Sequence, residues 1–188
     1  MRYLLAIAIA LSGCQTRHPD REFVMALLEN RTDRVRDPHD YPPRDAEAAR
    51  DWLLNDLLDR GWEVVESDTM SRSMMWKRIK RISLSSDHWD TEPWHQLVVL
   101  SHEDGHTRQV EAEVFVDYAV NMTWRAVLEA EAARGVAVAM GRAGIPRRYW
   151  LADSMSALQR STKGKLSYET LEDIKALLED DFERAILQ

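Results

Sequence analysis

The stretch His102-Glu103-Asp104-Gly105-His106 decides the fold that this sequence predicts. In a helix, residues four positions apart lie on the same face, so the imidazoles of His102 and His106 can bind one metal ion. Glu103 lies one position further around the helix, close enough to accept a proton from a water molecule on that metal. The five residues therefore predict a metal-binding helix with a general base beside the metal.

The residues before this stretch predict the helix that the two histidines need. Four apolar positions recur at the spacing of one helix face: Trp94, Leu97, Val98 and Leu100. Pro93 suits the first helical turn, and Thr91 or Asp90 is placed to cap it. Gly105 disfavours a helix by about 1 kcal/mol relative to alanine, so we interpret it as a point where a second backbone approaches closely. The alternative is a polar, solvated helix face that carries two histidines by chance.

A catalytic zinc ion takes a third protein ligand and keeps one position open for water. The elongated form of the motif adds a glycine and a third histidine, but this chain has Gln109 and Ala112 at those positions. A glutamate on a later helix is the other common solution. Residues 124–132 are rich in alanine and leucine and predict such a helix, which carries Glu129 and Glu131. Because these two carboxylates are two positions apart, they should face different ways.

Two segments together resemble a known family. Residues 102–109 (HEDGHTRQ) and 125–132 (RAVLEAEA) are similar to the compact gluzincin metallopeptidases of bacteria and phages, in which H-E-x-x-H-x-x-Q is followed by a helix with R-x-x-x-E-x-x-A. The resemblance covers residues 76–150 and implies a zincin-like fold, a Zn²⁺ cofactor and a peptide or protein substrate. It also implies that Glu129 is the third ligand beside the two histidines.

Four other acidic residues stay open as the third ligand: Glu111, Glu113, Asp117 and Glu131. An acidic residue on a helix is usually only solvated, which counts against each of them. Ala133 stands where related membrane zincins often have an aspartate, so the hydrogen bonds around the ligands are either incomplete or supplied from elsewhere. Peptide hydrolysis also needs a donor that stabilises the oxyanion near the metal, and Tyr149, Tyr118 and His95 are the candidates.

The N-terminus predicts export. Arg2 precedes a short apolar run that ends in small residues, so residues 1–13 are predicted to be a signal peptide, too short to serve as a membrane-spanning anchor. Residues 11–14 (LSGC) resemble a bacterial lipobox, which implies cleavage before Cys14 and lipid attachment to its thiol. Gln15 follows the cysteine, which by resemblance favours the outer membrane of a diderm host, facing the periplasm. The alternative is a buried N-terminal helix with an incidental cysteine.

The rest of the chain predicts one domain. Residues 14–22 form a lipidated tether, and residues 23–188 are long enough for one zincin-like core. The formal net charge is -7 and no long basic stripe is present, which excludes nucleic acid as the expected partner. The expected partners are a peptide or protein substrate and, through the lipid, a membrane.

The expected fold class is α+β, mainly helical, with a small sheet before the metal-binding helix. Helices are predicted over 22–30, 46–60, 112–143, 149–160 and 166–187, and strands over 62–67 and 74–85. Asp45 and Ser167 are predicted caps, and Gly61 ends a helix. Residues 76–84 either align a substrate peptide, by analogy with zincins, or form an ordinary edge strand.

The function predicted from the sequence is a zinc metallopeptidase in which His102, His106 and Glu129 bind zinc and Glu103 is the catalytic base. The alternative is a zincin-derived envelope lipoprotein without catalysis that acts as a binding or assembly factor. Retention of Glu103 favours the enzyme, because a structural zinc site needs no base. Asp104 argues the other way, since a second acidic group beside Glu103 would raise its pKa.

Overall fold

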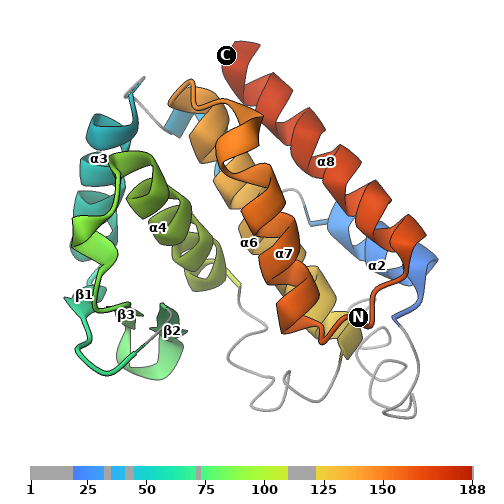
Figure 1. The fold of residues 1–188 in the computed structure, drawn as a ribbon, viewed down its shortest axis with the longest axis horizontal. Coiled ribbons are helices and arrows are strands. Elements are labelled where there is room, and N and C mark those ends of the chain that lie inside the picture. The colour runs from blue at the N-terminus through green and yellow to red at the C-terminus, as the bar shows by residue number, and fades with distance from the viewer. Residues whose placement is uncertain (1–18, 32–34, 41–44, 71–72, 110–121, 188) are drawn as a thin grey trace.

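The computed structural model describes residues 19–31, 35–40, 45–70, 73–109 and 122–187. In these ranges the chain forms six α-helices and one three-stranded sheet (Figure 1). The helices are α2 (Arg21–Glu29), α3 (Ala46–Asp59), α4 (Pro93–Thr107), α6 (Met122–Arg142), α7 (Leu151–Ser161) and α8 (Tyr168–Leu187). The strands are β1 (Glu63–Glu66), β2 (Met74–Trp76) and β3 (Arg81–Leu84). The mainly helical α+β class is therefore confirmed.

The predicted signal peptide, Cys14 and the first part of the tether lie outside the described residues. The last two residues of the predicted tether, Arg21 and Glu22, belong to α2 instead. Arg21 forms an ion pair with Asp173 of α8 at 2.6 Å, and Asp20 caps the helix by accepting from the backbone N–H of Phe23 at 2.9 Å. Within the ranges that the structure describes, no helix combines the length and the hydropathy needed to cross a bilayer.

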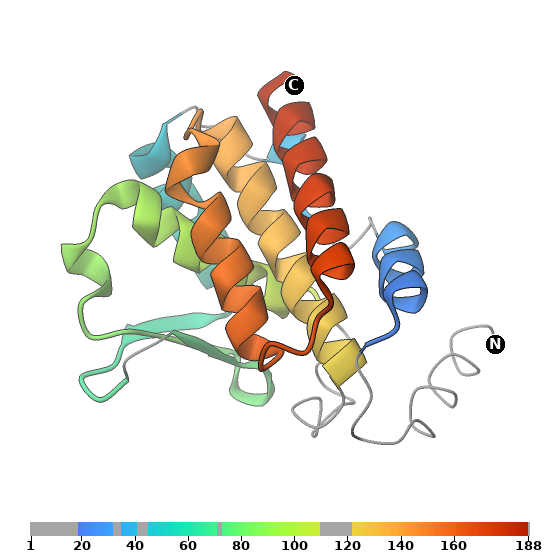
Figure 2. The same ribbon diagram turned by 45° about the vertical axis from the view of Figure 1, so that its right-hand side comes forward.

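Helix α6 is the centre of the molecule. All of its 21 residues except Thr123, Arg125 and Arg142 are buried. Helices α2, α4, α7 and α8 pack around it, with α4 and α8 on opposite sides and α7 across its front (Figure 1). The turned view shows α2 beside the first turns of α8 (Figure 2). A helix that is buried all round needs small and apolar residues, which the alanines and valines of α6 provide.

Helices α4 and α6 come into backbone contact at two glycines. A Cβ atom built on Gly105 would lie 2.7 Å from the Cα atom of Ala132, which is closer than Cβ atoms approach other atoms. A Cβ atom on Gly135 would lie 3.3 Å from the carbonyl oxygen of Ser101. The prediction that Gly105 marks a close approach of a second backbone is confirmed, and that backbone belongs to the helix that carries Glu129.

The single strand predicted over residues 74–85 is wrong. The chain instead forms β2, a short 3₁₀ turn over Lys77–Ile79 and then β3, which pairs antiparallel with β2. The reversal needs a left-handed residue, and Lys80 supplies it with φ of 48°. Sequence patterns do not predict this turn, because lysine rarely adopts that conformation. The strand order is β1-β3-β2, so β3 lies in the centre of the sheet and cannot receive a substrate strand.

The predicted helix ends marked by Asp45, Gly61 and Ser167 are confirmed, and the helix start predicted at residue 112 lies outside the described residues. Asp45 accepts a hydrogen bond from the backbone N–H of Ala48 at 2.8 Å, and Ser167 accepts one from Thr170 at 3.2 Å. Gly61 follows α3 with φ of 79°. Helix α4 begins at Pro93 as predicted, but neither predicted side chain caps it. The Thr91 hydroxyl donates instead to the carbonyl of His88, and Glu92 occupies the cap position without a side-chain bond.

Candidate metal centre

Three predicted ligands converge where α4 meets α6. The Nε2 atoms of His102 and His106 are 3.1 Å apart. One carboxylate oxygen of Glu129 lies 3.5 Å from the first and 3.9 Å from the second. Two ligand atoms bound at about 2.0–2.1 Å to a tetrahedral zinc ion lie roughly 3.3–3.4 Å apart. The three atoms are therefore close enough together to bind one metal ion.

The three side chains of the cluster differ in their exposure to solvent. The exposed fraction of the side chain falls from 24% at His102 to 12% at His106 and 8% at Glu129. A zinc ion held by three protein ligands keeps a fourth position for water. Of the three side chains, that of His102 is the most accessible to water and that of Glu129 the least.

The carboxylate of Glu129 is ionised in this setting. Burial alone would raise its pKa, but a hydrogen bond from His102 and the positive charges of His106, His102 and Arg125 bring the pKa down to about 2. The ionised form is the one that binds a metal ion. The two histidines face Glu129 across the contact between α4 and α6, which is the contact that Gly105 permits.

Glu103 is buried beside the cluster, with 5% of its surface exposed. The pKa of Glu103 is raised to about 7, mainly because burial raises it, while the charge of His106 lowers it and the charge of Glu129 raises it. A carboxylate with a pKa near neutrality can accept and return a proton at physiological pH. Its position in the sequence, directly after His102, places it within reach of a water molecule on the metal.

Asp104 does not act on Glu103 in the way the sequence suggested. The charges that shift the pKa of Glu103 are those of Glu129 and His106. Asp104 is two positions from each histidine, so it faces a different side of α4. Burial opposes its ionisation, but Arg36, Arg108 and Arg60 hold the pKa of this carboxyl below its usual value. The expected influence of Asp104 on the base is therefore wrong.

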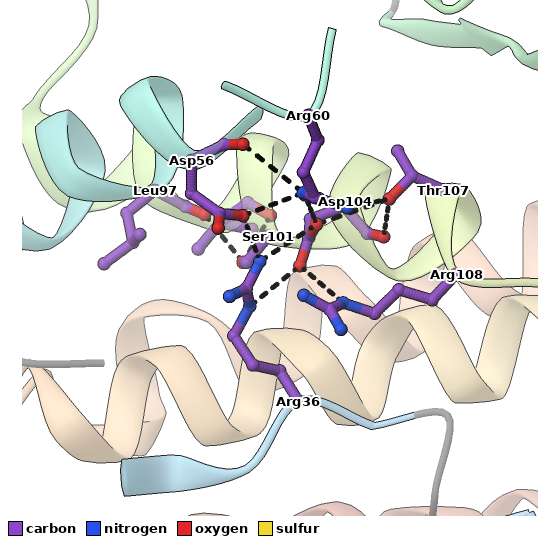
Figure 3. Close-up of polar contacts among 9 residues, drawn as sticks. Arg36, Asp56, Arg60, Leu97, Ser101, Asp104, Thr107 and Arg108 are labelled. Atoms are coloured by element: carbon purple, nitrogen blue, oxygen red, sulfur yellow. Dashed lines mark hydrogen bonds and ion pairs between the residues drawn. The ribbon is translucent and has the colours of Figure 1, made fainter. Parts of the chain in front are cut away.

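The arginines around Asp104 come from three parts of the chain (Figure 3). Arg36 and Arg108 each donate to Asp104 at 3.2 Å, and Arg60 donates to it as well. Asp56 in α3 accepts from Arg36 at 2.5 Å and forms an ion pair with Arg60 at 3.0 Å. This group, which we call the Asp104 cluster, joins α3, α4 and the segment 35–40 behind the metal site.

Among the rivals for the third ligand, the structure describes only Glu131. It is 3% exposed and points away from the histidines, where it forms an ion pair with the buried Arg31. The sequence argument that Glu129 and Glu131 face different ways is confirmed. Glu111, Glu113 and Asp117 lie outside the described residues.

Gln109 forms hydrogen bonds around the predicted ligands, whereas Ala133 has no side-chain group that could form them. Its side chain lies 2.8 Å from Nδ1 of His106 and donates to the carbonyl oxygen of Leu128 at 2.6 Å. Gln109 ends the H-E-x-x-H-x-x-Q motif that carries the family resemblance, but its contact with His106 was not predicted. The signal was present, because a residue three positions after His106 lies on the same side of the helix.

The oxyanion candidates do not gather at the cluster in the described part of the chain. Tyr149 packs on Trp94 with 5.5 Å between ring centroids, and its hydroxyl accepts from Arg148 at 3.2 Å. Trp94 is eight residues before His102, which corresponds to about 12 Å along a helix. His95 shares the helix face of His102 but lies about 10 Å before it. Tyr118 is outside the described residues.

Comparison with known proteins identifies no relative. No protein-family model, no curated protein sequence and no solved structure matches this chain.

Proposed function

We propose that the chain is a zinc-dependent metallopeptidase of gluzincin type, which hydrolyses peptide bonds in peptides or proteins. The observation that carries this proposal is the convergence of His102, His106 and Glu129, whose ligand atoms are close enough together to bind one metal ion. The buried Glu103 beside them supports catalysis over a purely structural site, because structural zinc sites have four protein ligands and need no base.

The residues around the site divide the chemistry of peptide hydrolysis between them. A zinc ion on the three ligands would lower the pKa of a water molecule and polarise the carbonyl of the scissile bond. Glu103 accepts the proton of the attacking water and then donates it to the nitrogen of the leaving amine. Glu129 contributes one negative charge to the site, which offsets part of the charge of the cation.

An extended substrate would meet the outer strand β2 and not the central β3. Lys77, directly after β2, donates from Nζ to the backbone carbonyl of Gln109, so this end of the sheet is held against the end of α4. Substrate peptides often bind by adding a strand to a sheet edge.

We place the protein in the cell envelope, anchored by lipid on Cys14 and facing the periplasm of a diderm host, on the strength of the lipobox resemblance.

Zinc stoichiometry tests the proposal. The full chain should bind one Zn²⁺ with His106→Ala abolishing binding and Glu129→Gln weakening it, and His39→Ala, on an exposed histidine outside the site, should bind like the wild type. Glu103→Gln should keep its zinc and lose hydrolysis of an unfolded protein substrate. A wild-type chain without zinc after reconstitution would overturn the proposal. Zinc binding without any Glu103-dependent hydrolysis would support the non-catalytic lipoprotein instead.

A further inference from the structure

Gln109 is a fully buried polar residue that contacts both metal-binding helices. Its side chain has no exposed surface and lies just beyond the end of α4. One end of the amide is 2.8 Å from Nδ1 of His106, and the other is 2.6 Å from the carbonyl oxygen of Leu128 in α6. Leu128 directly precedes Glu129, so one side chain spans from one ligand to the backbone beside another.

The partners of Gln109 determine which way its amide faces. A carbonyl oxygen can only accept, so the NH₂ group of Gln109 must face Leu128. The amide oxygen therefore faces His106, and it can only accept there. The proton of a neutral His106 is consequently on Nδ1. The lone pair on Nε2 is then directed toward His102 and Glu129, where the metal would bind.

The position of Gln109 is itself fixed at its backbone. Its N–H donates to the carbonyl of His106 at 3.2 Å, and its carbonyl accepts from Nζ of Lys77. The residue is therefore held by α4, by α6 and by the turn after β2. A side chain with so little freedom loses little further entropy when it orients a neighbour.

From this geometry we propose that Gln109 is a positioning residue for the zinc site. It fixes His106 as the Nδ1–H tautomer and ties the orientation of that imidazole to the backbone that carries Glu129. The inference rests on the proposed zinc function and deepens it. Hydrogen bonds to the far nitrogen of a metal-binding histidine typically contribute a factor of about 10–100 in metal affinity.

The chain provides a matched control in Gln96. This glutamine lies in α4 as well, is 3% exposed, donates to the carbonyls of Trp89 and Thr91 and accepts from Arg50. None of these partners is one of the three proposed metal ligands. Gln109→Met and Gln96→Met therefore remove similar buried amides from the two ends of the same helix, and only the first touches the zinc site.

The first measurement is the zinc affinity of the full chain and both variants, by competition with a chromophoric chelator. We expect Gln109→Met to bind Zn²⁺ about 10- to 100-fold more weakly than the wild type, and Gln96→Met to bind within a few-fold of it. Co²⁺ in Gln109→Met should also show an altered visible spectrum, because the imidazole is no longer held in place. Equal affinities for all three proteins, or equal losses in both variants, would overturn the proposal.

The second measurement reports the tautomer without any metal. The ¹⁵N chemical shifts of the His106 imidazole in the metal-free protein, at a pH where it is neutral, distinguish Nδ1–H from Nε2–H. The wild type should show the Nδ1–H form, and Gln109→Met should shift toward Nε2–H. The chemical-shift measurement separates the role of Gln109 from the proposed zinc function, because it reports the tautomer of His106 even if the chain binds no zinc. An unchanged tautomer in the variant would overturn the inference.

A conservative variant covers the case in which Gln109→Met does not fold. Gln109→Glu keeps an acceptor for His106 and removes the donor to Leu128. It should retain the Nδ1–H tautomer of His106 and bind zinc more tightly than a variant without any acceptor, such as Gln109→Leu. Loss of the tautomer in Gln109→Glu would contradict the proposed role.

Discussion

At the scale of single residues, the metal helix places two neighbouring carboxylates in opposite surroundings. Glu103 is buried with no arginine among the charges that shift its pKa, which rises to about 7. Asp104 is buried among Arg36, Arg60 and Arg108, which keep its pKa low. The carboxylate of Glu103 can exchange a proton near neutrality, whereas the carboxylate of Asp104 stays ionised and binds the three arginine side chains. Adjacent positions in the sequence thus supply a base and a structural charge.

The Asp104 cluster gives a prediction for stability. Asp104→Asn removes the anion and leaves the buried Arg36 without one of its carboxylates, so the free energy of unfolding should fall by about 3 kcal/mol or more. Asp173→Asn breaks the exposed ion pair with Arg21 and should cost under about 1 kcal/mol. Urea denaturation of both variants measures the difference. Equal costs would show that the cluster contributes no more than a surface pair.

The imidazole of His88 predicts a pH dependence of stability. It is 1% exposed, and neither ring nitrogen has a hydrogen-bond partner among the described residues. Burial, with the charge of His95, lowers its pKa from 6.5 to about 4. The unfolded chain therefore binds more protons than the folded chain between these values, and stability is lost as the pH falls from 6.5 toward 4.

The substitution His88→Phe tests this contribution, because it removes the titrating group and keeps an aromatic ring beside Trp89. The melting temperature of the variant should fall less than that of the wild type between pH 7 and pH 5. His39→Phe, at an exposed position, should leave the pH dependence unchanged. Parallel curves for the wild type and His88→Phe would contradict the prediction.

At the scale of elements, helices were predicted well and the sheet less well. The apolar spacing before His102 predicted α4, and Asp45 and Ser167 gave the starts of α3 and α8, because these signals are local. The hairpin of β2 and β3 was missed because its turn depends on Lys80 in a left-handed conformation. Nothing in the alternating pattern distinguishes one long strand from two strands that reverse.

In the candidate site, too, the features with a local sequence signal were predicted and those that depend on distant residues were not. The motif alone predicted His102, Glu103 and His106, since all three are fixed by helix geometry. The choice of Glu129 over Glu131 came from the family resemblance. The spacing of the two residues predicted only that their side chains face different ways, and not which of them faces the histidines. In the structure an ion pair with Arg31, 100 positions away in the sequence, occupies Glu131. Such long-range pairing has no local signal.

The close contact of α4 with α6 predicts that adding a methyl group at Gly105 destabilises the protein. Gly105→Ala should favour the helix by about 1 kcal/mol on propensity alone, yet its Cβ would lie 2.7 Å from Cα of Ala132. The two helices would have to separate, so we expect a lower melting temperature and weaker zinc binding. Adding Ala132→Gly should not rescue the variant, because the nearest atom belongs to the backbone. A melting temperature at or above that of the wild type would contradict this.

At the scale of the whole molecule, α6 carries three buried charged residues that each face a different element. Glu129 faces the histidines of α4, Glu131 pairs with Arg31, and Arg134 pairs with Asp181 of α8 at 2.6 Å. Because these partners lie on different sides, a rotation or shift of α6 would break all three pairs at once. The rotation and the axial position of α6, and with them the position of Glu129, are therefore fixed by partners far apart in the sequence, from Arg31 to Asp181.

The ion pair between Arg134 of α6 and Asp181 of α8 predicts that a single substitution destabilises the protein more than the double substitution does. Arg134→Met leaves Asp181 buried at 4% exposure with the exposed Arg184 as its remaining partner, so the free energy of unfolding should fall by about 3 kcal/mol. Replacing both residues, with Arg134→Met and Asp181→Leu, should regain most of that loss, since no uncompensated charge stays in the core. Chemical denaturation of the single and double variants measures the coupling. Additive losses would show that the two side chains do not act as a pair.

The place of His106 has a consequence for the kinetics of metal exchange. It is the second-last residue of α4, whereas Glu129 lies inside a helix that is buried on all sides. The ends of helices open far more often than the interiors of buried ones, and at this end the opening has to break the bonds of Gln109 to Leu128 and Lys77 and those of Arg108 and Thr107 to Asp104. A bound cation would therefore escape when the last turn of α4 frays, with Glu129 still in place. The lifetime of the metal would be set by one helix turn, and it would be shorter than the lifetime of the folded protein.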